Sequence, residues 1–200
     1  MLAVLAGVVL AGCTIVIPGG GGGGGKSGGG SSDDGASDDF NQTDVMFAQM
    51  MIPHHEQAIA MSEILIDTEG VSDDSIELAE QIAETQQPEI DQLEGLLESW
   101  GIDPMSDDGM QGMGGTDGDR MSGMAGMLSA EEIAALDAAT GAEAERLFLD
   151  GMIEHHEGAI GMAEPVLIEG QNPELIELAG EIVSTQLAEI ETMQNLVARL

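Results

Sequence analysis

The chain has 200 residues, and 38 acidic side chains against four Lys and Arg give it a formal net charge of -34 at pH 7. A surface this acidic repels phosphates and anionic lipid headgroups, which argues against nucleic acid as a partner and against electrostatic binding to membranes. It attracts cations instead. An excess of negative charge of this size predicts a halophilic protein, because salt screens the repulsion between the carboxylates.

The first segment is an apolar run at residues 2–12, which is too short to cross a bilayer and suits a signal peptide. The run ends in LAGC at residues 10–13, which resembles the lipobox of exported lipoproteins. The resemblance implies a signal peptide at residues 1–12, a lipid on Cys13 and a location on the outer face of the cytoplasmic membrane. The alternative is an apolar N-terminus with an incidental cysteine.

Residues 13–39 form the predicted tether between this lipid anchor and the folded part of the chain. Residues 18–39 are rich in Gly, Ser and Asp, a composition that buries too little apolar surface to fold. From residue 40 onward the sequence changes to helix-forming residues with a 3.6-residue apolar period. We therefore expect residues 40–200 to form the folded domain.

An internal repeat determines the expected architecture of this domain. FAQMMIPHHEQAIAM at residues 47–61 returns as FLDGMIEHHEGAIGM at residues 148–162, and IELAEQI at 76–82 returns as IELAGEI at 176–182. A T-Q-x-x-E-I segment follows in both copies, beginning at Thr85 and Thr185. The two units, residues 40–100 and 142–200, predict a duplicated helical hairpin.

Four long helices are predicted at about residues 42–68, 73–99, 142–169 and 173–199, with a short extra helix at about residues 129–139. Asn172 before a proline and Ser72 before two aspartates are typical helix starts, and Ser129 begins a capping-box sequence. Short turns within each hairpin and one long crossover, residues 101–128, indicate an all-α four-helix bundle.

All four histidines occur in two equivalent pairs at or beside the apolar stripe of their helices. Met51 stands three residues before His54, close enough for the side chains to converge, and the second unit repeats this spacing. A lone buried His is usually structural and a lone buried Met is usually core filler, but packing alone would favour Leu, because a buried imidazole needs a partner. The candidate metal ligands are His54, His55, His155, His156, Met51, Met61, Met152 and Met162.

The types of ligand discriminate between metals. A di-iron or di-manganese bundle needs Glu three residues before its histidine, and Met51 and Met152 occupy those positions. Thioether with imidazole suits Cu(I), and imidazoles also accept Cu(II). Zinc could bind through the histidines alone, but the methionines would then have no role. The predicted metal is therefore copper, as Cu(I) or Cu(II).

The crossover contains further methionines in a stretch that is otherwise mainly Gly, Asp and Ser. They are Met105, Met110, Met113, Met121, Met124 and Met127. Methionines without a surrounding hydrophobic segment make a poor core, so we consider them auxiliary ligands for a soft metal. The alternatives are sacrificial oxidation and anchoring of the crossover to the bundle.

The paired M-I-x-H-H-E-x-A-I-x-M segments, each followed by a T-Q-x-x-E-I helix, resemble the DUF305 family of exported proteins over about residues 40–200. The resemblance implies a ferritin-like helical fold. Because the family includes copper-binding proteins of the CopM type, it also implies copper binding or resistance outside the cytoplasm. The motif match assigns this role to the four histidines, with the core methionines beside them.

Three functions remain open at this point. The first is an anchored scavenger that captures copper and buffers it or passes it on. The second is a metal-dependent oxidase, which is disfavoured by the missing Glu-x-x-His ligands and the absence of Tyr, so no catalytic residue is assigned. The third is a metal-free interaction or stress module with structural histidines. No pattern identifies a protein partner.

Overall fold

The structure, a computed structural model, describes residues 39–104 and 124–200. Its helices are α1 (Gln42–Ile66), α2 (Asp73–Trp100), α4 (Ala130–Ala138), α5 (Gly141–Glu169) and α6 (Pro173–Val197). Four of them are long and α4 is short, as the apolar period and the capping sequence predict. Each end of the long helices lies at most two residues from its predicted position.

Side chains at the helix starts explain where the helices begin. A side-chain oxygen accepts a hydrogen bond from a backbone N–H of the first turn at Asn41, Ser72, Ser129 and Asn172. Asn41 and Ser129 form full capping boxes with Asp44 and Glu132, respectively, which confirms the predicted start of the short helix. A glycine ends the second helix. The C-terminal end of α2 is at Gly101, whose φ of 70° is left-handed backbone that glycine adopts without strain.

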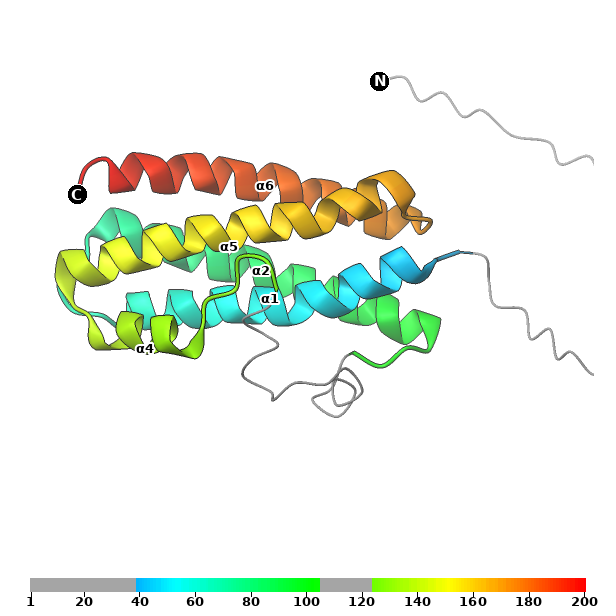
Figure 1. The fold of residues 1–200 in the computed structure, drawn as a ribbon, viewed down its shortest axis with the longest axis horizontal. Coiled ribbons are helices and arrows are strands. Elements are labelled where there is room, and N and C mark those ends of the chain that lie inside the picture. The colour runs from blue at the N-terminus through cyan, green and yellow to red at the C-terminus, as the bar shows by residue number, and fades with distance from the viewer. Residues whose placement is uncertain (1–38, 105–123) are drawn as a thin grey trace, which may run out of the picture. The chain divides into compact units, whose positions relative to one another are not determined.

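The four long helices pack as two antiparallel hairpins (Figure 1). Helix α1 packs on α2 and α5 packs on α6, and the two hairpins meet mainly through α1 and α5. The short α4 contacts both α1 and α5 and lies at the end of the bundle where α5 begins (Figure 1). This arrangement confirms the all-α, ferritin-like four-helix bundle made from a duplicated hairpin.

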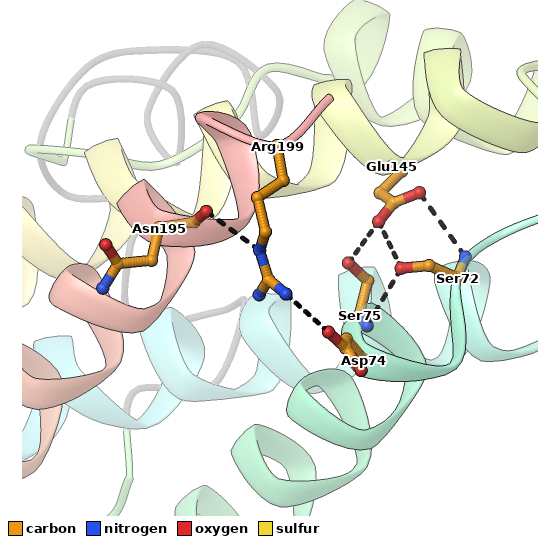
Figure 2. A network of polar contacts seen from close by, with 6 residues as sticks. All are labelled: Ser72, Asp74, Ser75, Glu145, Asn195 and Arg199. Carbon is orange, nitrogen blue, oxygen red and sulfur yellow. Dashed lines mark hydrogen bonds and ion pairs between the residues drawn. The ribbon is translucent and has the colours of Figure 1, made fainter.

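A buried carboxylate from each unit binds a helix start in the other unit. Asp44 of α1 is fully buried and accepts a hydrogen bond from the backbone N–H of Asn172, just before α6, at 3.1 Å. Its repeat equivalent on α5, Glu145, accepts hydrogen bonds from the hydroxyls of Ser72 and Ser75 at the start of α2 (Figure 2). The duplicated sequence therefore produces two equivalent contacts that join the units at opposite ends of the bundle.

The contacts around Glu145 are strong enough to set its ionisation. Burial alone would raise the pKa of Glu145, but the hydrogen bonds from Ser72 and Ser75 together outweigh burial and lower it. At the same end of the bundle, the exposed Arg199 contacts Asp74 (Figure 2), and Nη1 of Arg199 lies 2.9 Å from Oδ2 of Asp74. That ion pair faces water and adds little stability, so the buried Glu145 is the main polar contact there.

Several predictions concern residues that lie outside the described part of the chain. They are the signal peptide at residues 1–12, the lipid on Cys13, the tether apart from residue 39, and the crossover methionines Met105, Met110, Met113 and Met121. These assignments stay predictions, as do the domain boundaries drawn from the sequence. Within residues 39–104 and 124–200, no helix combines the length and apolarity that a membrane span requires.

Candidate metal site

The structure brings the four histidines together in the interior of the bundle. His54 and His55 lie on α1, His155 and His156 lie on α5, and all four residues are fully buried. The rings of His54 and His155 are in contact across the two hairpins, with centroids 3.7 Å apart and planes inclined by 37°. The two predicted pairs therefore occupy one region of the core.

The second histidine of each pair contacts a glutamate on the other helix of its own hairpin. Nε2 of His55 lies 2.7 Å from Oε2 of Glu89 on α2. Nε2 of His156 lies 2.7 Å from Oε2 of Glu189 on α6. Both glutamates are buried, so these contacts are shielded from water.

Two glutamines complete a layer of polar residues across the bundle, which we call the central polar layer. Its members, all buried, are His54, His55, Gln86, Glu89, His155, His156, Gln186 and Glu189. Two apolar clusters flank the layer, and each contains residues from all four long helices. Along every long helix one cluster precedes the layer and the other follows it. The core is thus apolar on both sides of one polar layer.

Many polar atoms of this layer have no hydrogen-bond partner among the described residues. They include Nδ1 of all four histidines, Nε2 of His155, and both amide atoms of Gln86 and of Gln186. An unpartnered buried polar group costs roughly 1–3 kcal/mol, so native proteins usually satisfy it. The layer therefore has the chemistry of a site that takes up a further group.

Burial keeps the two central histidines neutral. Desolvation is the main cause and the neighbouring His55 adds to it, so that the pKa of His54 falls to about 3. Desolvation, followed by the electrostatic effects of His54 and His156, likewise holds the pKa of His155 well below its usual value. Metals bind the neutral form of imidazole, so both rings are ready to ligate at neutral pH.

The four core methionines lie at two different distances along the helices from the histidines. Met51 and Met152 are fully buried and stand one turn before a histidine pair on the same helix face. Met61, also fully buried, and Met162, partly buried, lie two turns beyond the first histidine of each pair and pack in the apolar clusters. The first two thioethers are therefore better placed to share a metal with the imidazoles.

The end of the crossover packs against the central histidines. Nε2 of His54 donates a hydrogen bond to the carbonyl of Ala125 at 3.2 Å. A Cβ at Gly158 of α5 would collide with the same carbonyl, so only glycine permits this close approach. The side chain of Gln57 adds two hydrogen bonds to the backbone of Leu128, at 2.8 and 2.9 Å. We call this segment, residues 124–128, the strap.

Two of the six crossover methionines lie in the strap. Met127 is buried, and Met124 is half-buried. Both line a cleft between the strap and α5, together with Asp150 and Glu154. Met127 is thus anchored on the bundle, which was one of the alternatives that the sequence left open. Its thioether nevertheless lies beside a cleft that contains carboxylates.

The glutamates and glutamines of the layer were missed by reasoning from sequence. Leu78, Ile82, Gln86, Glu89 and Leu93 follow one another along α2 at spacings of three or four residues, which puts all five on one helix face. Both polar residues therefore lie on an apolar stripe. The sequence contained a pattern that predicts these buried polar residues, because the T-Q-x-x-E-I segment places Gln and Glu on an apolar stripe in both copies.

In the described ranges, no group of three or more His, Cys, Asp or Glu side chains is arranged to hold a metal ion. Copper accepts thioethers as well as imidazoles, and a methionine stands one turn before each histidine pair.

Comparison with known proteins relates these features to a family. Residues 44–197 match the family described as "Domain of unknown function (DUF305)". A comparison with curated proteins gives no significant match.

Several solved structures are similar to this chain. A DUF305 fragment from Deinococcus radiodurans is 33% identical with a TM-score of 0.70, over 80% of this chain and 99% of that one. A DUF305 "putative secreted protein" from Streptomyces coelicolor is 32% identical with a TM-score of 0.68, over 78% and 93%. CopM in its Cu(I)-bound form is 26% identical with a TM-score of 0.61, over 80% and 98%. CopM has also been solved with Cu(II) and with silver bound.

Proposed function

This chain belongs to the DUF305 family, and on that premise we propose that it binds copper in the central polar layer. The observation that carries the proposal is the group of four buried histidines, whose unpartnered ring nitrogens lie where the two hairpins pack together. The proposed ligands are His54, His55, His155 and His156 with Met51 and Met152, and with Met61 and Met162 as more distant candidates.

The chemistry of these donors favours copper. Imidazole is a borderline donor and thioether a soft one, and copper accepts both. Because the pKa values of His54 and His155 are lowered by burial, copper displaces no proton from these two rings at neutral pH. A bound ion would also satisfy ring nitrogens that are otherwise buried without a partner.

The solved relatives support the same class of ion. CopM, which shares 25–28% identity with this chain, was solved with Cu(I), with Cu(II) and with silver bound. Silver(I) prefers soft donors as Cu(I) does, which agrees with the combination of thioether and imidazole in this chain. We infer from this agreement that Cu(I) is the tighter-bound valence.

We also propose that the protein works outside the cytoplasmic membrane. The LAGC sequence at residues 10–13 would place a lipid on Cys13, and residues 13–39 would tether the bundle to the membrane. The description of the Streptomyces coelicolor relative supports export. At this place the bundle would capture copper and buffer it or pass it on, and its acidic surface would concentrate cations nearby.

The crossover methionines are proposed as auxiliary ligands that take up a soft ion on its way to the central polar layer. Met124 and Met127 support this role, because they line a cleft beside α5 and belong to the strap that contacts His54. Asp150 and Glu154 in the same cleft add negative charge that attracts a cation.

Competition with a Cu(I) chelator tests copper binding. Cu(I) is a sharper probe than Cu(II), because the 38 carboxylates bind Cu(II) non-specifically and suit Cu(I) poorly. Wild-type protein should withhold Cu(I) from the chelator, and replacement of all four histidines by Gln should abolish the tightest binding. Equal Cu(I) affinity of the two proteins would overturn the proposal.

Two further variants make this test specific. Glu56→Gln with Glu157→Gln removes the exposed carboxylate next to each histidine pair and should leave the Cu(I) affinity unchanged. Met51→Leu with Met152→Leu conserves the core volume and should weaken Cu(I) more than Cu(II). If the variant without histidines does not fold, the methionine variant decides, and an unchanged Cu(I) affinity there would count against the site.

A further inference from the structure

Two carboxylate–histidine contacts in the central polar layer have no role in the copper proposal, which needs only imidazoles and thioethers. Glu89 contacts His55 and Glu189 contacts His156, and in both cases the distance from Nε2 to Oε2 is 2.7 Å. The sequence separations differ, being 34 and 33 residues, yet the same two atoms meet at the same distance. The contact is therefore a feature that the fold reproduces in both units.

The contact determines which ring nitrogen is free. An ionised carboxylate only accepts hydrogen bonds, so Nε2 of each histidine is the donor and carries the hydrogen. In the neutral imidazole, the lone pair is then on Nδ1. Nδ1 of His55 and Nδ1 of His156 are both buried and have no partner in the part of the chain that the structure describes. Each ring thus offers one buried lone pair to a ligand.

We propose that Glu89 and Glu189 are positioning residues of the copper site, which hold His55 and His156 with Nε2 protonated and present Nδ1 as the ligating atom. This inference rests on the proposed copper binding. The carboxylates act through the imidazoles and not on the metal, because they fix the ring orientation and increase the basicity of Nδ1. Histidines that bind metals generally have such a second partner.

The other two histidines provide a comparison. Nε2 of His54 donates to the neutral carbonyl of Ala125 at 3.2 Å, so Nδ1 of His54 is also free. Neither ring nitrogen of His155 has a side-chain partner among the residues described, and its ring interacts with the backbone of His54. Hydrogen bonds to a charged acceptor are stronger than those to a neutral one. The two rings held by glutamates are therefore the ones whose orientation and tautomer are most firmly set.

A purely structural role for the glutamates is the competing explanation, since a buried carboxylate also needs a hydrogen-bond donor. Glu→Gln at both positions keeps the size and one oxygen acceptor and removes the charge, whereas Glu→Leu removes the acceptor as well. A structural role predicts a change in stability with no change in the copper affinity of folded molecules. A positioning role predicts that the tautomer or the affinity changes.

The test combines proton–nitrogen NMR of the metal-free, full-length protein with Cu(I) competition on the same variants. Long-range spectra report which nitrogen of each histidine carries the hydrogen, and we expect Nε2 for His55 and His156 in the wild type. Glu89→Gln with Glu189→Gln should weaken Cu(I) binding by about 10- to 100-fold with the helical content preserved. The matched control, Glu94→Gln with Glu191→Gln, removes two exposed carboxylates from the same helices and should change the affinity little.

Each outcome of the test decides a separate point. A hydrogen on Nδ1 of His55 and His156 in the wild type, or an unchanged Cu(I) affinity in the folded double variant, would overturn the inference. Wild-type protein that takes up no Cu(I) would refute the proposed function instead. If the double variant does not fold, Glu89→Gln alone replaces it under the same criterion, because the side chain of Glu89 is more exposed than that of Glu189, at 11% against 4%.

Discussion

Acidification is expected to destabilise the metal-free protein through its two central histidines. Burial lowers the pKa of His54 from 6.5 to about 3, and it lowers the pKa of His155 in the same direction. Between pH 6.5 and about pH 3, His54 binds a proton in the unfolded chain but not in the folded chain. The contribution of neutral His54 to stability is therefore complete above pH 6.5 and is lost as the pH falls toward 3.

The size of the effect follows from the pKa shift of His54. Each pH unit below 6.5 removes roughly 1.4 kcal/mol from the free energy of unfolding, which amounts to about 2 kcal/mol at pH 5. His155 adds a loss of the same sign. The electrostatic effect of the neighbouring His55 and His156 also opposes protonation of His54, whereas the hydrogen bond to the carbonyl of Ala125 favours it and is outweighed by burial.

Urea unfolding of chelator-treated protein at pH 7, 6 and 5 measures this loss, with high salt present to screen the acidic surface. The comparison is with His54→Leu, because the titration of all other groups largely cancels between the two proteins. Between pH 7 and pH 5 the wild type should lose about 2 kcal/mol more than the variant, with the larger part of the loss below pH 6. Parallel pH dependences would refute a buried, neutral His54, and His155→Leu provides an independent second comparison.

Four further predictions concern the anchor, the site, the strap and the surface. Cys13→Ser should move the protein from the membrane fraction to soluble or unprocessed forms, and unchanged membrane association would rule out the lipid. Because the rings of His54 and His155 are in contact, His54→Ala and His155→Ala should each cost nearly as much copper affinity as both together, whereas additive losses would indicate two sites. Gly158→Ala places a Cβ against the carbonyl of Ala125 and should cost about 1–3 kcal/mol in urea unfolding, so a neutral effect would contradict the packing of the strap. The thermal unfolding midpoint should rise from low to molar salt, and full stability at low salt would exclude a halophilic adaptation.

The helices could be predicted from the sequence because their determinants are local. Ser129 and Glu132 form the expected capping box, and Asn172 starts α6 through its side chain. The apolar period placed His54 and His155 inside the bundle, and the repeat showed that the two must lie on equivalent helices. A histidine pair that occurs twice, at the same place in each repeat unit, predicts a shared role more strongly than a single pair would.

The contacts that build the candidate site could not be predicted in the same way, because they join residues far apart in the chain. His55 borders the apolar stripe of its own helix, yet it is fully buried, since Glu89 on the neighbouring helix provides its polar partner. The contact between His54 and Ala125 spans 71 residues and depends on the path of the crossover. A helical projection describes one helix and contains no information about its neighbour.

The position of copper in the loaded protein tests the central claim most directly. Anomalous diffraction from crystals of the full-length protein loaded with Cu(I) locates the ion without reference to any assumed ligand. We predict copper within bonding distance of imidazole nitrogens in the central polar layer, with Nδ1 of His55 or His156 among its ligands. Copper bound only to surface carboxylates, or only to the crossover methionines with all four histidines unligated, would contradict the proposed site.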